Sequence, residues 1–456
     1  MTVKQNKPNV VFSFDQMIAS LKSATTAFTD TRTGKNKKYQ MLDATLGAFS
    51  VFFTQCPSFL SHQELLQEKH SLDNARSLFG MRGIPSSNQI RGLLDKVNPT
   101  LLSSVFEECF GALQASGHTD DYRVSLGKHK RDLLLALDGT QYFSSIALRC
   151  DNCSKKIIDK ETHYAHSMIT PTIVAPGNNK VISLTPEYIT PQDGDSKQDC
   201  ELKASKRWLA RSLNKYKLNE ATILGDDLYS HEPFCLDMLA KGLNFILVCK
   251  PDSHKTLYEW TRGITKEVSV DRLDGNKHLL YTYSYAEGVP LRDHKDALLV
   301  NFIEVTVIDR KTQTKLYHNA FVTNHKIEGK TDKQTRANLA ILIDAGRARW
   351  KIENENNNTL KTQGYHLEHN FGHGKKYLSS LLAGMNILAF LFHTMLEFMN
   401  HKYKLLRKVF RARKRLFESI RVLLIYHPYM NFESLMDFML EGPKMSHALE
   451  KLRYPL

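Results

Sequence analysis

The feature that most constrains the fold is an alternation of short apolar runs with helical stretches between residues 130 and 256. Three runs that read as strands come first, separated by Gly and Pro turns: DLLLALDGT, MITPTIVAPG and KVISLTPEYI. A helix, a strand, a helix and a strand then follow in CELKASKRWLARSLNKY, ATILGDDLYS, HEPFCLDMLAKG and NFILVCKP. This order predicts an α/β sheet that begins with a meander of antiparallel strands.

Helical sequence flanks this pattern, and one β-rich stretch interrupts it. Residues 1–125 carry apolar side chains at three- and four-residue spacing and predict a helical domain. The stretch 257–331 alternates polar and apolar residues and predicts a β-rich insertion. Helical spacing returns in 332–375, and 376–456 reads as a basic helical region. We therefore expect an α/β core in two parts, 130–256 and 332–375, between helical terminal regions.

The N-terminal region contains a run with helix-start signals, GIPSSNQIRGLLDKV. Pro85 and the serines after it can start a helix near Asn88. A short helix, a Gly/Pro turn and a second helix would form a helix-turn-helix, which would make residues 1–125 a DNA-binding domain. An ordinary helical bundle fits the same pattern equally well, so both readings stay open.

Charge gives an independent indication of the partner. The chain has 62 Lys and Arg residues against 48 Asp and Glu, a formal net charge of +14. An excess of this size favours a polyanionic partner. The segment from Lys402 to Arg421 lies within HKYKLLRKVFRARKRLFESIR, which holds nine Lys or Arg residues and one acid and as a helix would be basic almost all round. Phosphate neutralisation is its natural use, with a solvated charged face as the alternative.

Targeting signals and cysteine usage indicate a cytoplasmic protein. The polar N-terminus MTVKQNKPNV has no apolar core of a signal peptide. The stretch from Leu378 to Met399 is apolar, but Asn386, His393 and Glu397 interrupt it, which favours a buried core helix over a membrane span. Seven cysteines are few and odd in number, so no disulfide framework is expected and a reducing compartment fits.

Three carboxylates are the candidate catalytic residues. Asp138 and Asp226 each follow an apolar run, and ligands of open α/β sheets bind at the carboxyl ends of strands. Two carboxylates there form an oxygen-rich pocket that suits Mg²⁺ or Mn²⁺, and Glu353, within the helical ARWKIENE, can supply a third. Such ions activate the attacking oxygen and stabilise the leaving oxygen at a phosphodiester. Alternatively, both aspartates are ordinary turn or cap residues.

The combination of LDGT, ILGDDLYS and RARWKIENE, with a β-rich insertion before the last, resembles the bacterial cut-and-paste insertion-sequence transposases. These are DDE enzymes with an RNase H-like core, and this group has a Y-R-E-K signature: Tyr, two residues, Arg, three residues, Glu, six residues, Lys. The resemblance covers about residues 130–375. It implies a DNA transposase in which Asp138, Asp226 and Glu353 hold Mg²⁺ or Mn²⁺ while DNA ends are cleaved and joined to a target.

The signature is matched in part. Arg349 precedes the third acid by four residues, so the two share a helix face, and Arg349 can hold that acid or a DNA phosphate. Tyr229 matches the aromatic residue that follows the second acid. Gly346 stands where the signature has Tyr, and Leu360 stands where it has Lys. Lys361 comes one place late, which is about 100° around a helix.

The resemblance implies double-stranded DNA as the partner, both terminal inverted repeats and target DNA, bound by a homodimer in a synaptic complex. Trp350 is interpreted as a packed core residue, with base stacking as the alternative. An inactive DNA-binding relative and an RNase H-like nuclease without strand transfer stay open as other functions. The cations expected to contact the DNA backbone are Arg349, Lys361, Lys351 and Lys250.

A second metal site is predicted between the first two core strands. Cys150 and Cys153 form a C-x₂-C knuckle, and His163 and His166 follow ten residues later. Two thiolates and two imidazoles make a tetrahedral set for a structural zinc ion. Free cysteines and surface histidines are the alternative, because His163 and His166 would point to opposite faces of a strand. The histidine-rich run GYHLEHNFGHG at 364–374 is expected near DNA or the active site and not as a ligand source.

Overall fold

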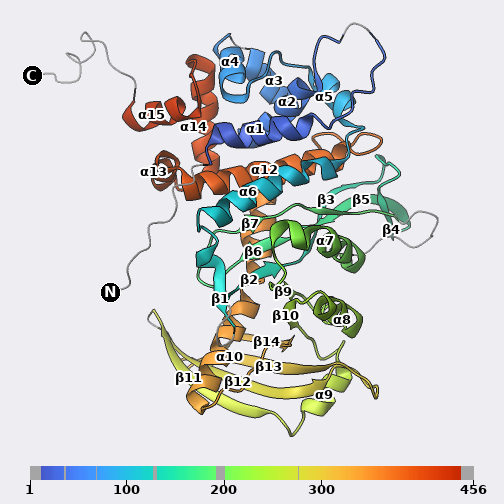
Figure 1. Ribbon diagram of the computed structural model, residues 1–456, viewed down its shortest axis with the longest axis vertical. Coiled ribbons are helices and arrows are strands. Elements are labelled where there is room, and N and C mark those ends of the chain that lie inside the picture. Colours follow the sequence, from blue (N-terminus) through green and yellow to red (C-terminus); the bar gives the residue numbers. More distant parts are fainter. Residues whose placement is uncertain are drawn as a thin grey trace, which may run out of the picture. The chain divides into compact units, whose positions relative to one another are not determined.

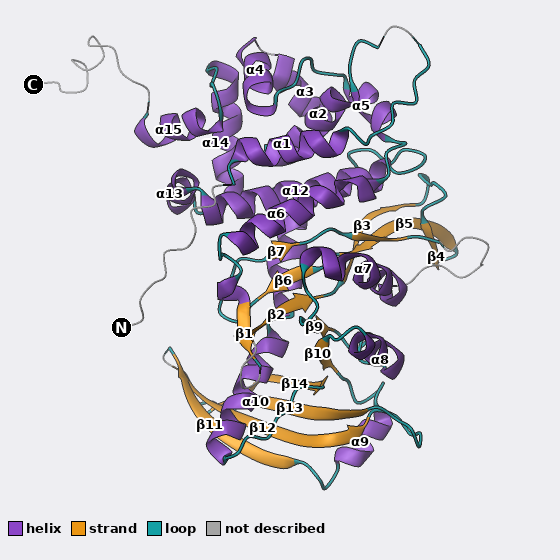
Figure 2. Ribbon diagram, viewed as in Figure 1, coloured by secondary structure: helices purple, strands orange, loops and turns teal. Residues whose placement is uncertain are grey.

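The computed structural model describes residues 12–34, 37–67, 69–126, 131–191, 201–275 and 277–442. It is a mixed α/β protein whose chain divides into two compact units (Figures 1 and 2). The first, called here the helical unit, comprises Met1–Gly117, Gln141–His166 and Asn358–Leu456. The second, the sheet unit, comprises His118–Thr140 and Ser167–Asn357. Each unit is therefore assembled from segments that are separated in the sequence.

A long apolar helix, α12 (Leu378–Met399), forms the core of the helical unit. By length and composition it could cross a membrane, but 94% of its most apolar window is buried inside the protein, which confirms the predicted core helix. It packs against α2 and α6. The other helices described in this unit are α1 (Phe14–Thr25), α2 (Met41–Phe53), α3 (Phe59–Gln67), α4 (Lys69–Asn74), α5 (Ser87–Leu94), α6 (Ser103–Ala115), α11 (Asn358–Thr362), α13 (His401–Val409), α14 (Arg413–Tyr426) and α15 (Phe432–Glu441), with η1 (Ala75–Phe79) and η2 (Pro99–Leu102).

The polar residues that interrupt the sequence of α12 all have partners inside the helical unit. The imidazole Nε2 of His393 lies 3.0 Å from the carbonyl oxygen of Phe53, and the Asn386 amide donates to the carbonyl of Tyr365 at 2.7 Å. Glu397 accepts hydrogen bonds from two arginines. Because each of these side chains makes at least one hydrogen bond, most of the cost of burying it is offset, although Oδ1 of Asn386 has no partner among the described residues.

Helix α5 begins where the sequence indicates. The Ser86 side chain accepts from the backbone N–H of Gln89, whose side chain in turn accepts from the backbone of Ser86, so the two residues form a capping box. The helix packs against α2. The helix start is therefore confirmed, whereas the DNA-binding helix-turn-helix stays a prediction.

The sheet unit contains one large mixed sheet, in the order β11-β12-β13-β14-β10-β9-β2-β6-β7 among its described strands, with β1 also paired to β2 (Figure 1). The predicted meander is confirmed, because β6 is antiparallel to both β2 and β7. Strands β9 and β10 then run parallel to β2. The strands are β1 (Arg123–Ser125), β2 (Arg131–Ala136), β6 (Thr172–Val174), β7 (Ile182–Ser183), β9 (Thr222–Gly225), β10 (Asn244–Val248), β11 (Lys266–Asp274), β12 (Lys277–Pro290), β13 (Leu299–Asp309) and β14 (Lys315–Thr323).

The β-rich stretch extends this sheet and does not stand apart from it. Strands β11 to β14 pair antiparallel in chain order, and β14 then pairs with the core strand β10, Val322 opposite Leu247. Helices connect the strands and cover the sheet, with α8 and α10 packed on β10. The helices described in the sheet unit are α7 (Glu201–Tyr216), α8 (Glu232–Ala240), α9 (Lys255–Thr261) and α10 (Asp332–Arg347), with η3 (Asp120–Tyr122) and the π-helix η4 (Ile352–Asn357).

Between β2 and β6 the chain forms three strands of a second, smaller sheet. The long apolar run breaks after Ala136, so that β3 (Gly139–Ser145) leaves the large sheet and pairs with β5 (Glu161–Ile169), which also pairs with β4 (Ser154–Ile158) and β8 (Glu187–Ile189). The turn from β4 to β5 uses Asp159 and Lys160, both with positive φ. Two such residues are typical of the tight type I′ turn of β-hairpins.

Packing explains why a glycine stands at the signature Tyr position. A Cβ added to Gly346 in α10 would lie 2.9 Å from the ring of Phe321 and 3.1 Å from Ile246. Both neighbours are core residues of the sheet, so any side chain at this position must push the helix away from it.

We expect the Gly346→Ala variant to lose about 1–3 kcal/mol of unfolding free energy, measured by urea denaturation, because of this overpacking. The matched control is Gly111→Ala in α6, where an added Cβ meets nothing within 4 Å. There the better helix propensity of alanine should leave stability unchanged or raise it by about 1 kcal/mol. Equal effects of the two substitutions would contradict the packing argument.

Candidate active site and candidate metal centre

Strand register brings two of the three predicted acids together. Strands β2 and β9 are parallel neighbours, and Ala136 pairs with Leu224. Asp138 and Asp226 each follow two residues later, so they leave the sheet at the same level. Adjacent strands lie about 4.8 Å apart. The two aspartates therefore occupy neighbouring strand ends, as the apolar runs before them indicate.

The third acid lies on the π-helix η4. Glu353 accepts a hydrogen bond from Nη1 of Arg349 at 2.7 Å. Asn357, four residues beyond Glu353, donates its side-chain amide to the Asp138 carboxylate at 3.0 Å and accepts from the Thr170 hydroxyl at 2.8 Å. Residues four apart share a helix face. Arg349, Glu353 and Asn357 thus present one polar face, and its Asn357 end contacts Asp138.

The pKa of Asp138 reflects its burial and the acids that lie around it. Burial, together with the negative charges of Glu201, Glu353 and Asp226, raises the pKa of Asp138 to about 7, although the positive charge of Arg349 opposes the shift. A carboxyl with so high a pKa sits where positive charge is lacking, and a bound cation would favour its ionised form. Strongly shifted pKa values of this kind cluster at functional sites.

A fourth acid, Glu201, belongs to the same cluster and was missed by the sequence reasoning. It is the first residue of α7, and its Oε1 accepts from the Gly139 backbone N–H at 3.0 Å and from the Tyr229 hydroxyl at 2.8 Å. Burial raises the pKa of its carboxyl, and Asp226 adds to the rise. In sequence it is only an acid in the first turn of a helix, a very common feature, so no specific signal could have found it.

Two glycines in the sequence motifs leave room for this cluster. A Cβ on Gly139 would lie 2.6 Å from Oε2 of Glu201, and a Cβ on Gly225 would lie 2.8 Å from the ring of Tyr229. Tyr229 is fully buried and its hydroxyl also bonds Ser205. The glycines of LDGT and ILGDD are thus required by close packing around the acids.

The residues near the second acid have structural tasks of their own. Asp227 accepts from the backbone N–H of Lys250 and from the hydroxyl of Ser253, each at 2.5 Å, so it fixes the loop after β10. The Lys250 side chain remains exposed, and Lys351 is half-buried. Trp350 is 48% exposed, so its interpretation as a packed core residue is wrong, because it lies at the break between α10 and η4.

The residues at the signature Lys position lie in the helical unit. Leu360 is fully buried, so a lysine there would have to bury its charge. Lys361 forms an ion pair with Glu368 at 2.8 Å. Its role as a DNA contact stays a prediction, and DNA would have to compete with this partner.

The metal-binding cluster of the helical unit differs from the predicted one by one residue. Among the described residues, the one group of His, Cys, Asp and Glu whose ligand atoms could share an ion is Cys150, Cys153, His166 and His373, all within 4.8 Å of one another. The prediction of His163 as a ligand is wrong. His163 and His166 are three residues apart on β5 and face opposite sides of it, and His163 pairs across from Lys156 instead.

The ligand atoms of this cluster have a defined protonation pattern. Nδ1 of His373 lies 2.9 Å from the carbonyl oxygen of Gly374 and can only donate to it, which leaves Nε2 facing the cluster with its lone pair. The Cys150 backbone N–H donates to Sγ of Cys153 at 3.4 Å. The hydrogen bond from Cys150 lowers the pKa of the Cys153 thiol to about 7. The same hydrogen bond raises the pKa of the Cys150 thiol, so a metal ion would displace a proton when it binds that sulfur.

The three predicted acids do not form a second group of this tightness among the described residues. Each carboxylate is engaged separately. Asp138 bonds Asn357, Glu353 bonds Arg349, and Asp226 accepts from the backbone N–H of Leu228 at 3.0 Å. Like charges repel one another at short range, and these separate partners offset part of that repulsion.

The basic C-terminal segment is two helices, α13 and α14, and part of its charge is structural. Arg407 and Arg413 donate to Glu397, and Arg421 donates to the backbone carbonyls of Thr54 and Gln55. The prediction of a single helix that is basic all round is therefore wrong, because the chain breaks between Val409 and Arg413. The exposed cations of the segment include Lys408, Arg411, Lys414 and Arg415.

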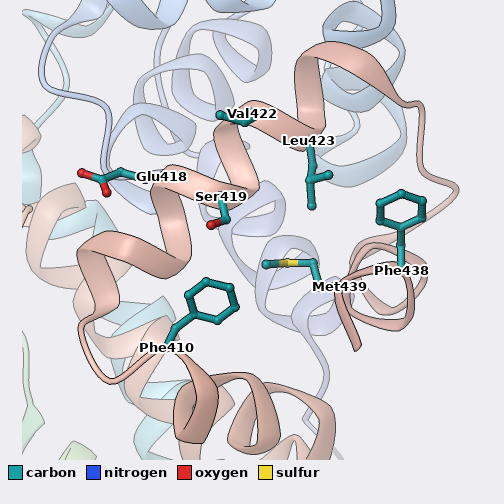
Figure 3. Close-up of a pocket in the computed structure, with 7 residues that line it drawn as sticks. All are labelled: Phe410, Glu418, Ser419, Val422, Leu423, Phe438 and Met439. Carbon is teal, nitrogen blue, oxygen red and sulfur yellow. The ribbon is translucent and has the colours of Figure 1, made fainter. Parts of the chain in front are cut away.

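An apolar pocket of about 480 Å³ lies between α14 and α15 (Figure 3). Its lining offers one carboxylate and one hydroxyl, so it lacks the groups that metal or acid–base chemistry needs. The residues that line it are Phe410, Glu418, Ser419, Val422, Leu423, Phe438 and Met439.

We expect Arg413→Ala to lower the unfolding free energy by about 2–4 kcal/mol, because it leaves the buried Glu397 carboxylate with one partner fewer. The adjacent Lys414 is exposed, and Lys414→Ala should change stability by less than about 0.5 kcal/mol. Urea unfolding followed by circular dichroism measures both. Equal stability of the two variants would show that the ion pair is not part of the core.

Comparison with known proteins adds no family to these observations. No protein-family model matches the chain, and no curated protein matches its sequence significantly.

Proposed function

We propose that this chain is a DDE-type DNA transposase whose sheet unit is an RNase H-like catalytic core. The observation that carries the proposal is the register of β2 and β9, which brings Asp138 and Asp226 to neighbouring strand ends, with Glu353 close enough to raise the pKa of Asp138. The order of an antiparallel meander followed by two parallel strands supports the same core.

The donor set fits hard divalent cations. Carboxylate oxygens are the ligands that Mg²⁺ and Mn²⁺ prefer. Burial and then the neighbouring negative charges raise the pKa of Asp138, and a bound cation would favour its ionised form. Asp138, Asp226 and Glu353 would hold the ions, which supply activation of the attacking oxygen and stabilisation of the leaving oxygen. The thiol and imidazole cluster of the helical unit suits a softer ion.

Side chains around the three acids would orient the carboxylates and contact DNA phosphates. Asn357 orients the Asp138 carboxylate, and Arg349 holds Glu353 with one of its donors. The Nε of Arg349 is buried and has no hydrogen-bond partner among the described residues. It is therefore a donor that a DNA phosphate could satisfy, with the exposed Lys250 side chain near the same strand ends as a further phosphate contact.

The partner that this function requires is double-stranded DNA, as terminal inverted repeats and as target, bound by a homodimer in the cytoplasm at the nucleoid. The net charge of +14 and the exposed cations of the segment 402–421 support a polyanionic partner.

We expect Asp138→Asn, Asp226→Asn and Glu353→Gln to abolish Mg²⁺-dependent cleavage of DNA that carries the inverted repeats flanking the gene. Loss of a metal ligand removes several kcal/mol of transition-state stabilisation, or about a thousandfold in rate. DNA binding, measured by gel shift, should persist. The control is Glu355→Gln, two residues from Glu353 on the same π-helix, which should cut normally.

The outcomes of this assay separate the alternatives. Normal cutting by all three variants would overturn the proposal. Cleavage without joined products would identify a nuclease, and specific binding without metal-dependent cleavage would identify an inactive DNA-binding relative.

The DNA-contact role of the basic segment predicts a change in salt dependence. A Lys414→Ala/Arg415→Ala double variant should reduce the slope of log affinity against log salt by about two, because each cation that contacts a phosphate releases about one counterion. The control removes two exposed lysines of the sheet unit, Lys295→Ala/Lys333→Ala, at equal cost in net charge. Equal slopes for both double variants would contradict a specific role for the segment.

A further inference from the structure

We propose that Cys150, Cys153, His166 and His373 bind a structural zinc ion. The site is independent of the proposed catalytic acids, since all four residues belong to the helical unit and all three acids belong to the sheet unit. It differs from the set that sequence spacing suggests, because its fourth ligand lies more than two hundred residues further along the chain.

Five of the six distances between the ligand atoms are those of a zinc tetrahedron. Zinc lies about 2.3 Å from sulfur and about 2.05 Å from nitrogen, so the edges should be about 3.8 Å between sulfurs, about 3.6 Å between sulfur and nitrogen and about 3.3 Å between nitrogens. The two Sγ atoms lie 3.7 Å apart, and the two Nε2 atoms lie 3.3 Å apart. Three sulfur–nitrogen distances are 3.5, 3.4 and 3.4 Å. All of these edges agree to within about 0.2 Å.

A disulfide or a purely hydrogen-bonded cluster fits this geometry less well. A disulfide requires sulfurs about 2.05 Å apart, and both cysteines are free. Without a metal, the two Nε2 atoms face each other, and the Nδ1 contact of His373 has already used the proton of its ring. A Zn²⁺ ion with two thiolates and two neutral imidazoles has no net charge, which suits a site where Cys153, His166 and His373 are buried.

The ligand chemistry selects the ion. Thiolate and imidazole donors in a tetrahedral array favour zinc over the hard cations that carboxylates bind. Aromatic rings enclose the site, with Tyr142 stacked on His166 and Phe143 against His373. Such an apolar surrounding excludes water and closes the coordination shell, as in structural and not catalytic zinc sites.

Contacts outside the ligand shell hold His373 in place. Asp95 accepts from the backbone N–H groups of Lys375 and Lys376, each at 3.0 Å. Asn152, within the knuckle, donates to the carbonyl of Lys376 at 2.7 Å. Gly374 has a φ of +69°, a left-handed conformation that favours glycine. The knuckle and the segment before α12 are therefore joined both by the ligands and by direct hydrogen bonds.

The zinc ion would tie together three segments of the chain, namely the loop before β4, strand β5 and the segment before α12. Strand β3 begins directly after Asp138, and β5 ends directly before Thr170, whose backbone N–H donates to the Asp138 carbonyl at 3.0 Å. The ion thus fixes the distal part of the segment from β3 to β5, whose two ends meet at Asp138. Its role is structural, and loss of the ion should loosen this segment.

Elemental analysis of the full chain, purified under reducing conditions, tests the proposal. We expect about one zinc ion per chain in the wild type and nearly none in His373→Ala or Cys153→Ala. The matched controls His163→Ala and His369→Ala, from the same strand and the same histidine-rich run, should keep the ion. His373→Cys should also keep it, since three thiolates and one imidazole form another stable zinc set.

A variant could lose zinc only because it fails to fold, so a second measurement uses the wild-type protein. A mercurial thiol reagent should release one equivalent of zinc from the wild type, detected with a chromogenic chelator. Absence of zinc from the wild type, with no uptake after reduction and addition of Zn²⁺, would overturn the proposal, as would loss of zinc from His163→Ala but not from His373→Ala. The Glu353→Gln variant should retain zinc, so failure of the proposed enzymatic function would not affect this result.

Discussion

The parallel pairing of β2 with β9 is the constraint on which the candidate active site depends. Its register sends two aspartates out of the sheet side by side, and two further acids approach from α7 and η4. Gathering negative charge in a half-buried place is unfavourable by itself. The structure offsets it with the Arg349 guanidinium, the Asn357 amide and the Gly139 backbone N–H. In the function that we propose, a bound divalent cation would supply further positive charge to this cluster.

Much of the fold could be predicted because its elements carry local signals. The apolar runs of the core and the helical spacing of α7, α8 and α10 each depend on neighbouring residues only, and these elements are confirmed. Pairings between strands that are far apart in the sequence leave no such local signal. The sequence marked the β-rich stretch, but it could not indicate that β14 continues the core sheet through β10. It also gave no sign that the first apolar run breaks after Ala136 and feeds a second sheet.

The residues of the candidate sites were likewise predictable where a local pattern marks them and not where a long-range contact places them. Asp138 and Asp226 were identifiable because an acid at the end of an apolar run is a local pattern. Glu201 and His373 were not, because one is an ordinary acid at a helix start and the other lies far along the chain from the cysteines that it joins. The zinc prediction chose the nearer histidine, His163, although strand alternation argued against it. Trp350 was assigned to the core on residue type, whereas its position at a helix break exposes it.

The π-helix η4 bears on the spacing of the Y-R-E-K signature. A π-turn takes one more residue than an α-turn. The eight residues from Glu353 to Lys361 therefore advance the helix by as much as seven do in a regular α-helix, and seven is the spacing that the signature requires. The wider turn therefore accounts for the lysine that is one place late in the sequence. Deleting one residue from η4 would remove the wider turn and the offset together.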